Sequence, residues 1–263
     1  MPLSTQAVLE LMQSVAAEVI TPRFRALAES DIDEKRPGDL VTVADREAEE
    51  LLTAALLEAY PDAVVLGEEK SAEVPELMEQ FRAASHGFTV DPVDGTKNFV
   101  KGSKDHAVMI AEVLDGVTER GWIWQPQHET AWVAERGAGV RRNGEPVRRT
   151  PAGDQPQGAT SIWSRRGRNP VGLPPLNGSW VCCGVDYPRL IEGEADFLLY
   201  GHTNPWDHLP GTLMVAEAGG TSAHPDGTPY TARSLGRGLV VAADPVTLER
   251  ATVACADLWP KRA

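Results

Sequence analysis

Apolar residues recur every three or four positions in four stretches of the chain, which is the spacing of one buried face of an α-helix. Capping and breaking residues agree with this pattern. Ser4 and Thr5 offer N-caps to the first stretch, Pro61 ends the second, and Gly219-Gly220 stops the third. Each stretch therefore predicts an amphipathic helix. The four ranges are 4–27, 43–61, 206–220 and 245–259.

Shorter runs rich in β-branched and aromatic residues predict strands. Asn143-Gly144, inside the segment 141–149, indicates a tight hairpin turn with solvated arms. Residues 188–200 read as a helix followed by a strand. The remaining predicted strands lie within 63–69, 87–91, 107–116, 119–127, 130–140, 179–186 and 238–244. Because strands and helices are grouped rather than strictly alternating, we expect a layered α+β fold.

Two segments lack periodicity. Residues 29–39 are polar and contain Pro37 and Gly38, so we expect a loop there. Residues 151–180 hold many Pro, Gly and Gln residues, which indicates a boundary between two parts of one compact unit. We expect an N-terminal α+β half, 1–150, and a C-terminal α/β half, 151–263.

Composition limits the classes of function. Lys and Arg number 25 and Asp and Glu 38, so the net charge of −13 argues against binding a nucleic acid polymer. Three cysteines, two of them adjacent, do not form a disulfide framework and favour a reducing compartment. No apolar run approaches the roughly 18 residues of a membrane span. We expect a cytoplasmic protein without a membrane partner.

The stretch 87–102, GFTVDPVDGTKNFVKG, carries the first candidate chemistry. Asp91 and Asp94 follow an apolar run, and Pro92 interrupts the strand ladder between them. Gly95 and Thr96 would then present free amides at the start of a helical turn, where anions bind. Carboxylates beside such a cradle suit Mg²⁺ and a phosphate group. Taken alone, the same residues also fit a turn with helix caps.

Two other elements end in carboxylates. Glu68 and Glu69 follow the predicted strand at 63–69, and Asp207 stands near the start of the helix at 206–220. Asp207 alone is most simply a helix cap. Together, three separate elements each place a carboxylate where the chain changes from one element to the next.

These residues carry a family resemblance. DPVDGTKNF (91–99) resembles the first signature of the inositol monophosphatase family, and WDHLPGTLMVAEAGG (206–220) resembles its second. GDLVTVADREAE (38–49) and LGEE (66–69) resemble the segments found upstream, in the same order. The resemblance implies a layered α-β-α-β-α sandwich and Mg²⁺-dependent hydrolysis of a small phosphorylated metabolite. It also implies two or three Mg²⁺ ions per site and a homodimer.

The resemblance also implies roles for individual residues. Glu68, Asp91 and the Val93 carbonyl look like ligands of a first metal, and Asp91, Asp94 and Asp207 like ligands of a second. Most of these ligands lie in the half 1–150, and Asp207 lies in the half 151–263.

Catalytic and substrate-binding roles follow from the same resemblance. Thr96 with Glu68 resembles the pair that orients an attacking water, and Asp45 resembles the residue that completes the Thr96 network. The residues expected to contact substrate are Asp94, Gly95, Thr96, Gly184, Tyr200 and Asp207.

The chain departs from the family pattern at positions that are expected to lie beside the substrate. Tyr200 stands where inositol-selective members have a glutamate, and 182–186 differs from the usual small-residue run beside the substrate. An inositol phosphate is therefore less favoured. Histidinol phosphate, a sugar phosphate and a 3'(2'),5'-bisphosphate nucleotide stay open as substrates. A non-catalytic metal-binding regulatory protein and a phosphotransferase with an aspartyl nucleophile are alternatives of other classes.

Several other residues are weaker candidates. His202 and His208 are better read as pocket-wall or surface groups than as ligands of a hard cation. Cys182 and Cys183 are read as small buried side chains on a strand. Lys35 could reach a phosphate from the 29–39 loop, although a solvated lysine is the simpler reading.

Overall fold

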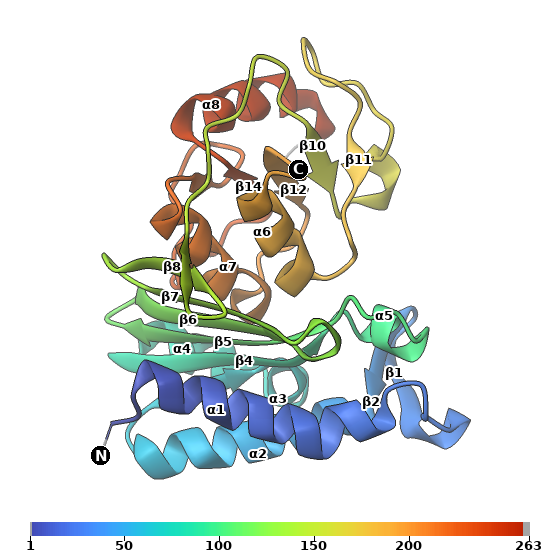
Figure 1. Cartoon of the computed structure of the whole chain (residues 1–263), viewed down its shortest axis with the longest axis vertical. Helices are drawn as coiled ribbons and strands as arrows, with labels where there is room; N and C mark the ends of the chain where they lie inside the picture. Colours follow the sequence, from blue (N-terminus) through green and yellow to red (C-terminus); the bar gives the residue numbers. More distant parts are fainter. Residues whose placement is uncertain (1, 260–263) are drawn as a thin grey trace.

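The computed structural model describes residues 2–259. Its elements stack in five layers: two helices, a large sheet, two helices, a small sheet and a last helix (Figure 1). Helices α1 and α2 cover one face of the large sheet, and α6 and α7 separate its other face from the small sheet. The predicted layered α+β fold is confirmed. The helices are α1 Thr5–Val15, α2 Val43–Ala59, α3 Glu68–Glu73, α4 Glu76–Ala83, α5 Thr96–Val100, α6 Cys183–Glu192, α7 Pro205–Glu217 and α8 Pro245–Ala254.

The large sheet has seven strands among the described residues, in sequential order from β3 to β9. The β3–β4 pair is parallel and every later pair is antiparallel. The strands are β3 Val64–Gly67, β4 His86–Asp94, β5 Ala107–Leu114, β6 Val117–Gln125, β7 Thr130–Glu135, β8 Gly139–Arg142 and β9 Glu145–Val147. The predicted tight turn at Asn143-Gly144 is confirmed, since both residues have positive φ and join β8 to β9.

The small sheet, counted within residues 2–259, has five strands in the order β11-β10-β12-β14-β13. Its strands are β10 Gly158–Thr160, β11 Asn177–Gly178, β12 Phe197–Tyr200, β13 Thr221–Ala223 and β14 Leu239–Ala242. The division of the chain into halves at residue 150 stays a prediction. Positions 1 and 260–263 of those halves lie outside the described residues.

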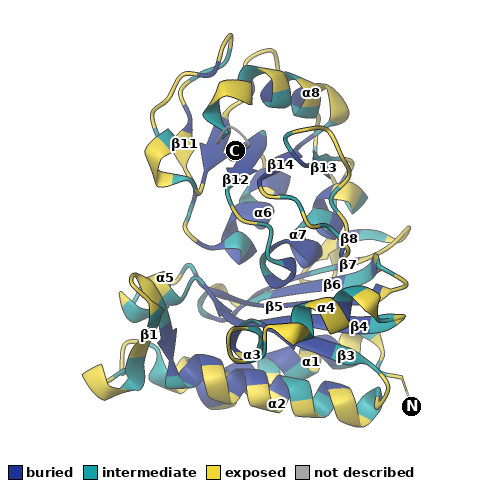
Figure 2. Ribbon diagram, turned by 180° about the vertical axis from the view of Figure 1, so that it is seen from behind, coloured by how far each residue is buried: buried dark blue, intermediate teal, exposed yellow. Residues whose placement is uncertain are grey.

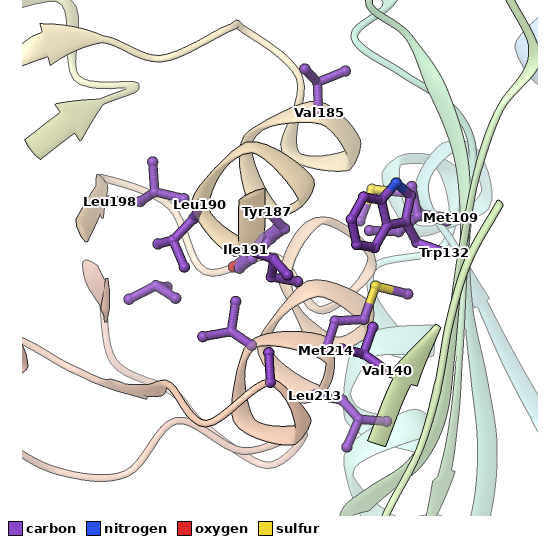
Figure 3. Close-up of a cluster of buried hydrophobic side chains, with 14 of the residues drawn as sticks. Met109, Trp132, Val140, Val185, Tyr187, Leu190, Ile191, Leu198, Leu213 and Met214 are labelled. Carbon is purple, nitrogen blue, oxygen red and sulfur yellow. The ribbon is translucent and has the colours of Figure 1, made fainter. Parts of the chain in front are cut away.

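The large sheet is buried on both faces (Figure 2). Along β5, Val108 and Ile110 pack toward α1 and α2, whereas Ala107 and Met109 pack toward α6 and α7. This alternation explains why the strand reads as a continuous apolar run. Figure 3 shows the second of these cores, in which residues of α6 and α7 such as Tyr187 meet the sheet.

Two sequence predictions of local structure were wrong. Residues 29–39 are not a plain loop: Ile32–Arg36 (β1) and Asp39–Thr42 (β2) pair as an antiparallel hairpin. Residues 179–186 are not a strand, because helix α6 begins at Cys183. Within residues 2–259 no helix combines the length and the apolar character that a bilayer crossing requires.

Candidate active site

Asp91 and Asp94 lie at the end of β4, on either side of a bulge. Asp91 pairs with Met109 and Asp94 with Ala107, so β4 carries one residue more than β5 between these points. Pro92 lies within the bulge and has no amide to donate to the ladder. The strand therefore runs on to Asp94 instead of ending at Asp91, and the bulge redirects the two aspartates.

The other candidate side chains sit in first turns of helices. Glu68 is the first residue of α3, Asp45 the third of α2 and Asp207 the third of α7. Thr96 is the first residue of α5. Helix N-termini carry partial positive charge and unpaired amides, which favour anionic groups. Four helices thus direct their positive ends toward the carboxylates of β4.

Thr96 joins α5 to α2. Its Oγ1 lies 3.1 Å from Asp45 Oδ1 and 3.1 Å from the Val93 carbonyl oxygen. Asp45 is fully buried and also accepts hydrogen bonds from the amide and hydroxyl of Thr42, forming a capping box for α2. The same carboxylate therefore caps a helix and fixes the orientation of Thr96.

Asp94 is held by the start of α6. The Gly184 amide donates to Asp94 Oδ2, and the Cys182 thiol lies 2.9 Å from the same oxygen. A Cβ on Gly184 would lie 2.5 Å from the Ala107 side chain, so a larger residue at 184 would separate α6 from β5. The structure thus places Gly184 against a predicted metal ligand.

Asp207 is oriented from its own helix. The Asn204 side chain, at the N-cap of α7, donates to Asp207 Oδ2 over 3.0 Å. Asp207 also contacts the Asp91 carboxyl group. Asn204 therefore fixes one oxygen of Asp207 and leaves the other toward β4.

Glu49 on α2 positions Glu68 by binding the first turn of α3. The buried Glu49 carboxylate on α2 accepts hydrogen bonds from the amides of Glu69 and Lys70, both at 2.8 Å, and so caps α3. A Cβ at Gly67 would come within 2.2 Å of this carboxylate. Glycine is therefore required at position 67 for the cap that orients Glu68.

Lys35 from the β1–β2 hairpin supplies a positive charge to the site. Its Nζ lies 2.7 Å from Glu68 Oε1 and 2.9 Å from Glu69 Oε1, and its side chain is 14% exposed. Burial opposes the charge, but the two carboxylates outweigh it and raise the pKa of Lys35. The reading of Lys35 as a solvated side chain was wrong.

Burial and mutual repulsion act on the carboxylates. Burial, followed by the charges of Glu68 and Asp94, raises the pKa of Asp91 well above its ordinary value. Burial, followed by Asp94, does the same for the pKa of Asp207. Burial also raises the pKa of Asp94 to about 6 and that of Asp45 to about 6. Such clustered buried carboxylates are unfavourable unless a cation is bound.

The donor atoms of this cluster suit a divalent cation. Asp91 is 1% exposed, and its Oδ1 is buried without a hydrogen-bond partner among the described residues. Donor atoms of Asp94, Cys183 and Asp207 all lie within 4.8 Å of one another. An orphaned buried carboxylate oxygen beside two further carboxylates is the chemistry of a Mg²⁺ or Mn²⁺ site.

A small pocket of about 140 Å³ lies next to Thr96, between residues of the hairpin, α5 and the segment before α6. Gly95, whose φ of 82° is left-handed, is the N-cap of α5. The pocket is lined by Asp39, Leu40, Gly95, Thr96, Lys97 and Val181.

Tyr200 does not reach this pocket. Its side chain is 2% exposed, and its hydroxyl donates to Asp186, which also accepts from the Trp180 amide. A direct contact between Tyr200 and substrate stays a prediction, and this geometry argues against it. His208 is likewise neither surface nor pocket wall: it is buried, and the Tyr187 hydroxyl and the His202 carbonyl occupy its two ring nitrogens.

Sequence reasoning missed Glu49, Asn204 and Cys183 as members of the site. Asn204 alone had a local signal, since it stands at a helix N-cap three residues before Asp207. Glu49 and Cys183 act on residues 20 or more positions away, which no spacing along the chain reveals.

Comparisons with known proteins agree with this fold. Nus factor SuhB of Pseudomonas aeruginosa is 28% identical over 219 residues, covering 78% of this chain and 79% of that protein. A fructose-1,6-bisphosphatase/inositol-1-monophosphatase of Thermotoga maritima is 29% identical, covering 71% and 73%. The structure of an inositol monophosphatase from Zymomonas mobilis matches with a TM-score of 0.75 at 25% identity, over 95% and 96% of the two chains. The model of the inositol monophosphatase family matches residues 3–260, and the chain therefore belongs to that family.

Proposed function

We propose that this protein is a Mg²⁺-dependent phosphatase that hydrolyses a small phosphate monoester with water as the nucleophile. The observation that carries the proposal is the buried carboxylate cluster with its unpartnered Asp91 oxygen, beside the Gly95-Thr96 turn. Family membership supports the reaction class.

The cation-holding residues would be Glu68, Asp91, Asp94, Asp207 and the Val93 carbonyl. Bound Mg²⁺ supplies Lewis-acid chemistry, neutralising the phosphate and making a water more acidic. Asp91 interacts electrostatically with Glu68, Asp94 and Asp207, so its carboxylate would help to hold the cation with each of them.

Thr96 and Asp45 would move a proton. The Thr96 hydroxyl has one hydrogen, and donating it to Asp45 leaves lone pairs that accept a hydrogen bond from the attacking water. Asp45, whose pKa burial raises to about 6, is a competent final acceptor near neutral pH. Glu68 would orient the water from the other side.

The phosphate group would lie against the first turn of α5. The Thr96 amide precedes the first intrahelical hydrogen bonds and is available to a phosphate oxygen, whereas the Gly95 amide donates to the Asp94 carboxylate. Gly184 borders this position by holding Asp94. No protein group is needed as nucleophile, so no phospho-aspartate is expected.

The proposal also concerns which phosphate monoester the protein hydrolyses. Inositol phosphates, sugar phosphates, histidinol phosphate and 3'(2'),5'-bisphosphate nucleotides all present a phosphate monoester. The relative named fructose-1,6-bisphosphatase/inositol-1-monophosphatase favours including sugar bisphosphates. An acidic side chain is absent at position 200, and the buried Tyr200 that replaces it bonds to Asp186, so inositol phosphate is not favoured over the other classes.

A second candidate is a regulatory protein that keeps the fold and binds a metal or a partner protein. The relative named a Nus factor favours keeping this alternative. The complete set of carboxylates with Thr96 favours catalysis over it. We further propose a cytoplasmic location, with which the free cysteines agree, and a homodimer, which the resemblance to the family implies.

The test is phosphate release from a panel of these four substrate classes, with Mg²⁺ and with EDTA. We expect release from at least one class with Mg²⁺ and none with EDTA. Release that is equal in EDTA would contradict the metal-dependent mechanism. Silence across the panel together with tight binding of a protein partner would favour the regulatory alternative.

A further inference from the structure

A thiol lies among the oxygen donors of the site. Cys183 is the first residue of α6 and is partly exposed, whereas Cys182 and Cys255 are buried. A sulfur atom is a poor ligand for Mg²⁺ but a preferred ligand for Zn²⁺ and Cd²⁺. No role in phosphate hydrolysis requires it.

The spacing of the donors fits one ion. The Cys183 sulfur and one oxygen each from Asp94 and Asp207 lie within 4.8 Å of one another. Two donors bound to a tetrahedral zinc ion at about 2.0–2.3 Å are separated by roughly 3.5 Å, somewhat less than the upper limit observed here. Small side-chain rotations therefore bring all three donors onto a single cation.

A second observation points to a cation at this place. The buried Asp91 carboxyl contacts Asp207, and its Oδ1 has no partner among the described residues. The group therefore offers one sulfur and two carboxylates, which are ligand types that zinc takes, and the neighbouring Asp91 adds a buried carboxylate whose uncompensated charge favours a cation here.

We propose that Cys183, Asp94 and Asp207 form a binding site for a thiophilic divalent cation such as Zn²⁺, which excludes Mg²⁺ from the same carboxylates. On binding, the S–H bond of Cys183 breaks, a sulfur–metal bond forms and the proton leaves to the buffer. Cation binding itself is independent of the proposed function. The consequence, inhibition of phosphate hydrolysis by Zn²⁺, rests on the proposed function.

Cadmium is a direct probe, because a cadmium–thiolate bond produces a charge-transfer absorption in the ultraviolet. We expect this band when Cd²⁺ is titrated into the metal-free protein, saturating near one equivalent. In Cys183→Ser the band should disappear and Cd²⁺ should bind about tenfold more weakly or worse. Excess Mg²⁺ should shift the wild-type titration to higher Cd²⁺ concentrations.

Two variants serve as controls. Cys255→Ala lies in a separate core under α8 and should retain the full band. Retention of the band in Cys183→Ser, or its loss only in Cys182→Ala, would overturn the assignment to Cys183. A wild-type titration that excess Mg²⁺ leaves unchanged would overturn the shared site.

Phosphate release then separates the two proposals. Zn²⁺ should inhibit the wild type at concentrations about tenfold lower than those that inhibit Cys183→Ser. A protein with the cadmium band but no phosphatase activity would retain this cation site and disprove the proposed function. A protein with phosphatase activity but no cadmium band would retain the proposed function and disprove the cation site.

Discussion

Carboxylates that are buried without counter-charges dominate the site at the residue scale. Asp45, Asp91 and Asp94 are each at most 7% exposed. Hydrogen bonds from Thr96, Gly184 and Cys182 compensate some of their oxygens, but the Asp91 oxygen has no partner in the described part of the chain. The arrangement is favourable only when a cation completes it.

Substitutions of Thr96 test the proposed transfer of a proton from the attacking water through Thr96 to Asp45. Thr96→Ala removes the hydroxyl that joins Asp45 to the attacking water, so we expect kcat to fall about 100-fold or more. Thr96→Ser keeps the oxygen and should retain most of the activity. Comparison of kcat for the two variants is the measurement. Equal losses in both would indicate that the methyl group, not the hydroxyl, matters.

Val181 carries backbone strain at the edge of the pocket. Its φ is 61°, a left-handed conformation that costs a β-branched residue about 1–2 kcal/mol. Its side chain is 45% exposed and contributes little to packing. Val181→Gly should therefore raise the free energy of unfolding by up to about 1 kcal/mol, after the entropy cost of glycine.

Chemical denaturation measures this change. Val171→Gly is the matched control, because Val171 is also exposed but has an ordinary φ. That variant should be destabilised slightly. If Val181→Gly lowers the free energy of unfolding as much as Val171→Gly does, the left-handed φ of Val181 does not destabilise the folded protein.

Local motifs explain which site residues could be predicted from the sequence. Asp91, Asp94 and Thr96 lie within six residues, so one segment contains their chemistry. Cys183 and Lys35 join the site only through folding: Lys35 is 33 residues from Glu68, and its charge reads as a solvated side chain until the hairpin is placed. Their burial in the folded protein, and not their residue type, distinguishes Cys183 and Lys35 from surface side chains.

At the scale of elements, the β1–β2 hairpin controls the charge of the site. Through Lys35 it places an ammonium group on Glu68, a predicted Mg²⁺ ligand. The ammonium group neutralises part of the negative charge of Glu68 and Glu69. Mg²⁺ must then bind beside a like charge or displace it.

Lys35→Gln should change two quantities in opposite directions. We expect Mg²⁺ to bind about tenfold more tightly, since a nearby positive charge is removed. The metal-free protein should become less stable, because Glu68 and Glu69 lose their partner. Calorimetric titration with Mg²⁺ and thermal melting measure the two effects.

Lys70→Gln is the control for this prediction. Its exposed pair with Glu73 lies on α3, close in sequence to the site but in solvent. It should leave both quantities nearly unchanged. Unaltered or weaker Mg²⁺ binding in Lys35→Gln would show that the ammonium group does not compete with the ion.

Helix α6 shows why one element could not be predicted. Its first residues, Cys183 to Val185, include a glycine and a β-branched valine and give no helical pattern, and Pro188 lies inside the helix. Proline removes the amide that would bond to the Gly184 carbonyl four residues earlier. The Gln125 side chain from β6 donates to that carbonyl over 2.8 Å, so tertiary contact replaces the missing bond.

The elements with a strong local pattern could be predicted. The long helices α1 and α2 have clear apolar periodicity, and Asn143-Gly144 determines the β8–β9 turn. The hairpin at 32–42 could not, because its arms are polar and its β1 strand is largely exposed. It is stabilised by contacts such as the Lys35 pairs rather than by its own hydrophobic pattern.

For the whole molecule, clustered carboxylates link stability to pH and metal. Burial raises the pKa of Asp186 to about 7, of Glu49 to about 7 and of Glu69 to about 8. The folded protein therefore binds protons that the unfolded chain has released. Stability of the metal-free protein should fall as pH rises from about 6.5 to about 8.

His106 and His208 oppose this trend only at the lower end of the window. Burial lowers the pKa of His106 to about 4 and of His208 to about 3, so both are neutral in the folded protein, and in the unfolded chain they are mostly neutral above about 7.5. Denaturation at several pH values, with and without Mg²⁺, measures the effect. Excess Mg²⁺ should raise stability most at the higher pH, and a rise of metal-free stability across the window would contradict the account.

The central claim is that the β4 carboxylates form the metal centre of a phosphatase. Its most direct test is Mg²⁺-dependent phosphate release by Asp94→Asn beside Asp33→Asn, an exposed aspartate of the hairpin paired with Arg46. The account predicts a loss of about 100-fold or more in Asp94→Asn and wild-type rates in Asp33→Asn. Wild-type rates in Asp94→Asn would contradict it.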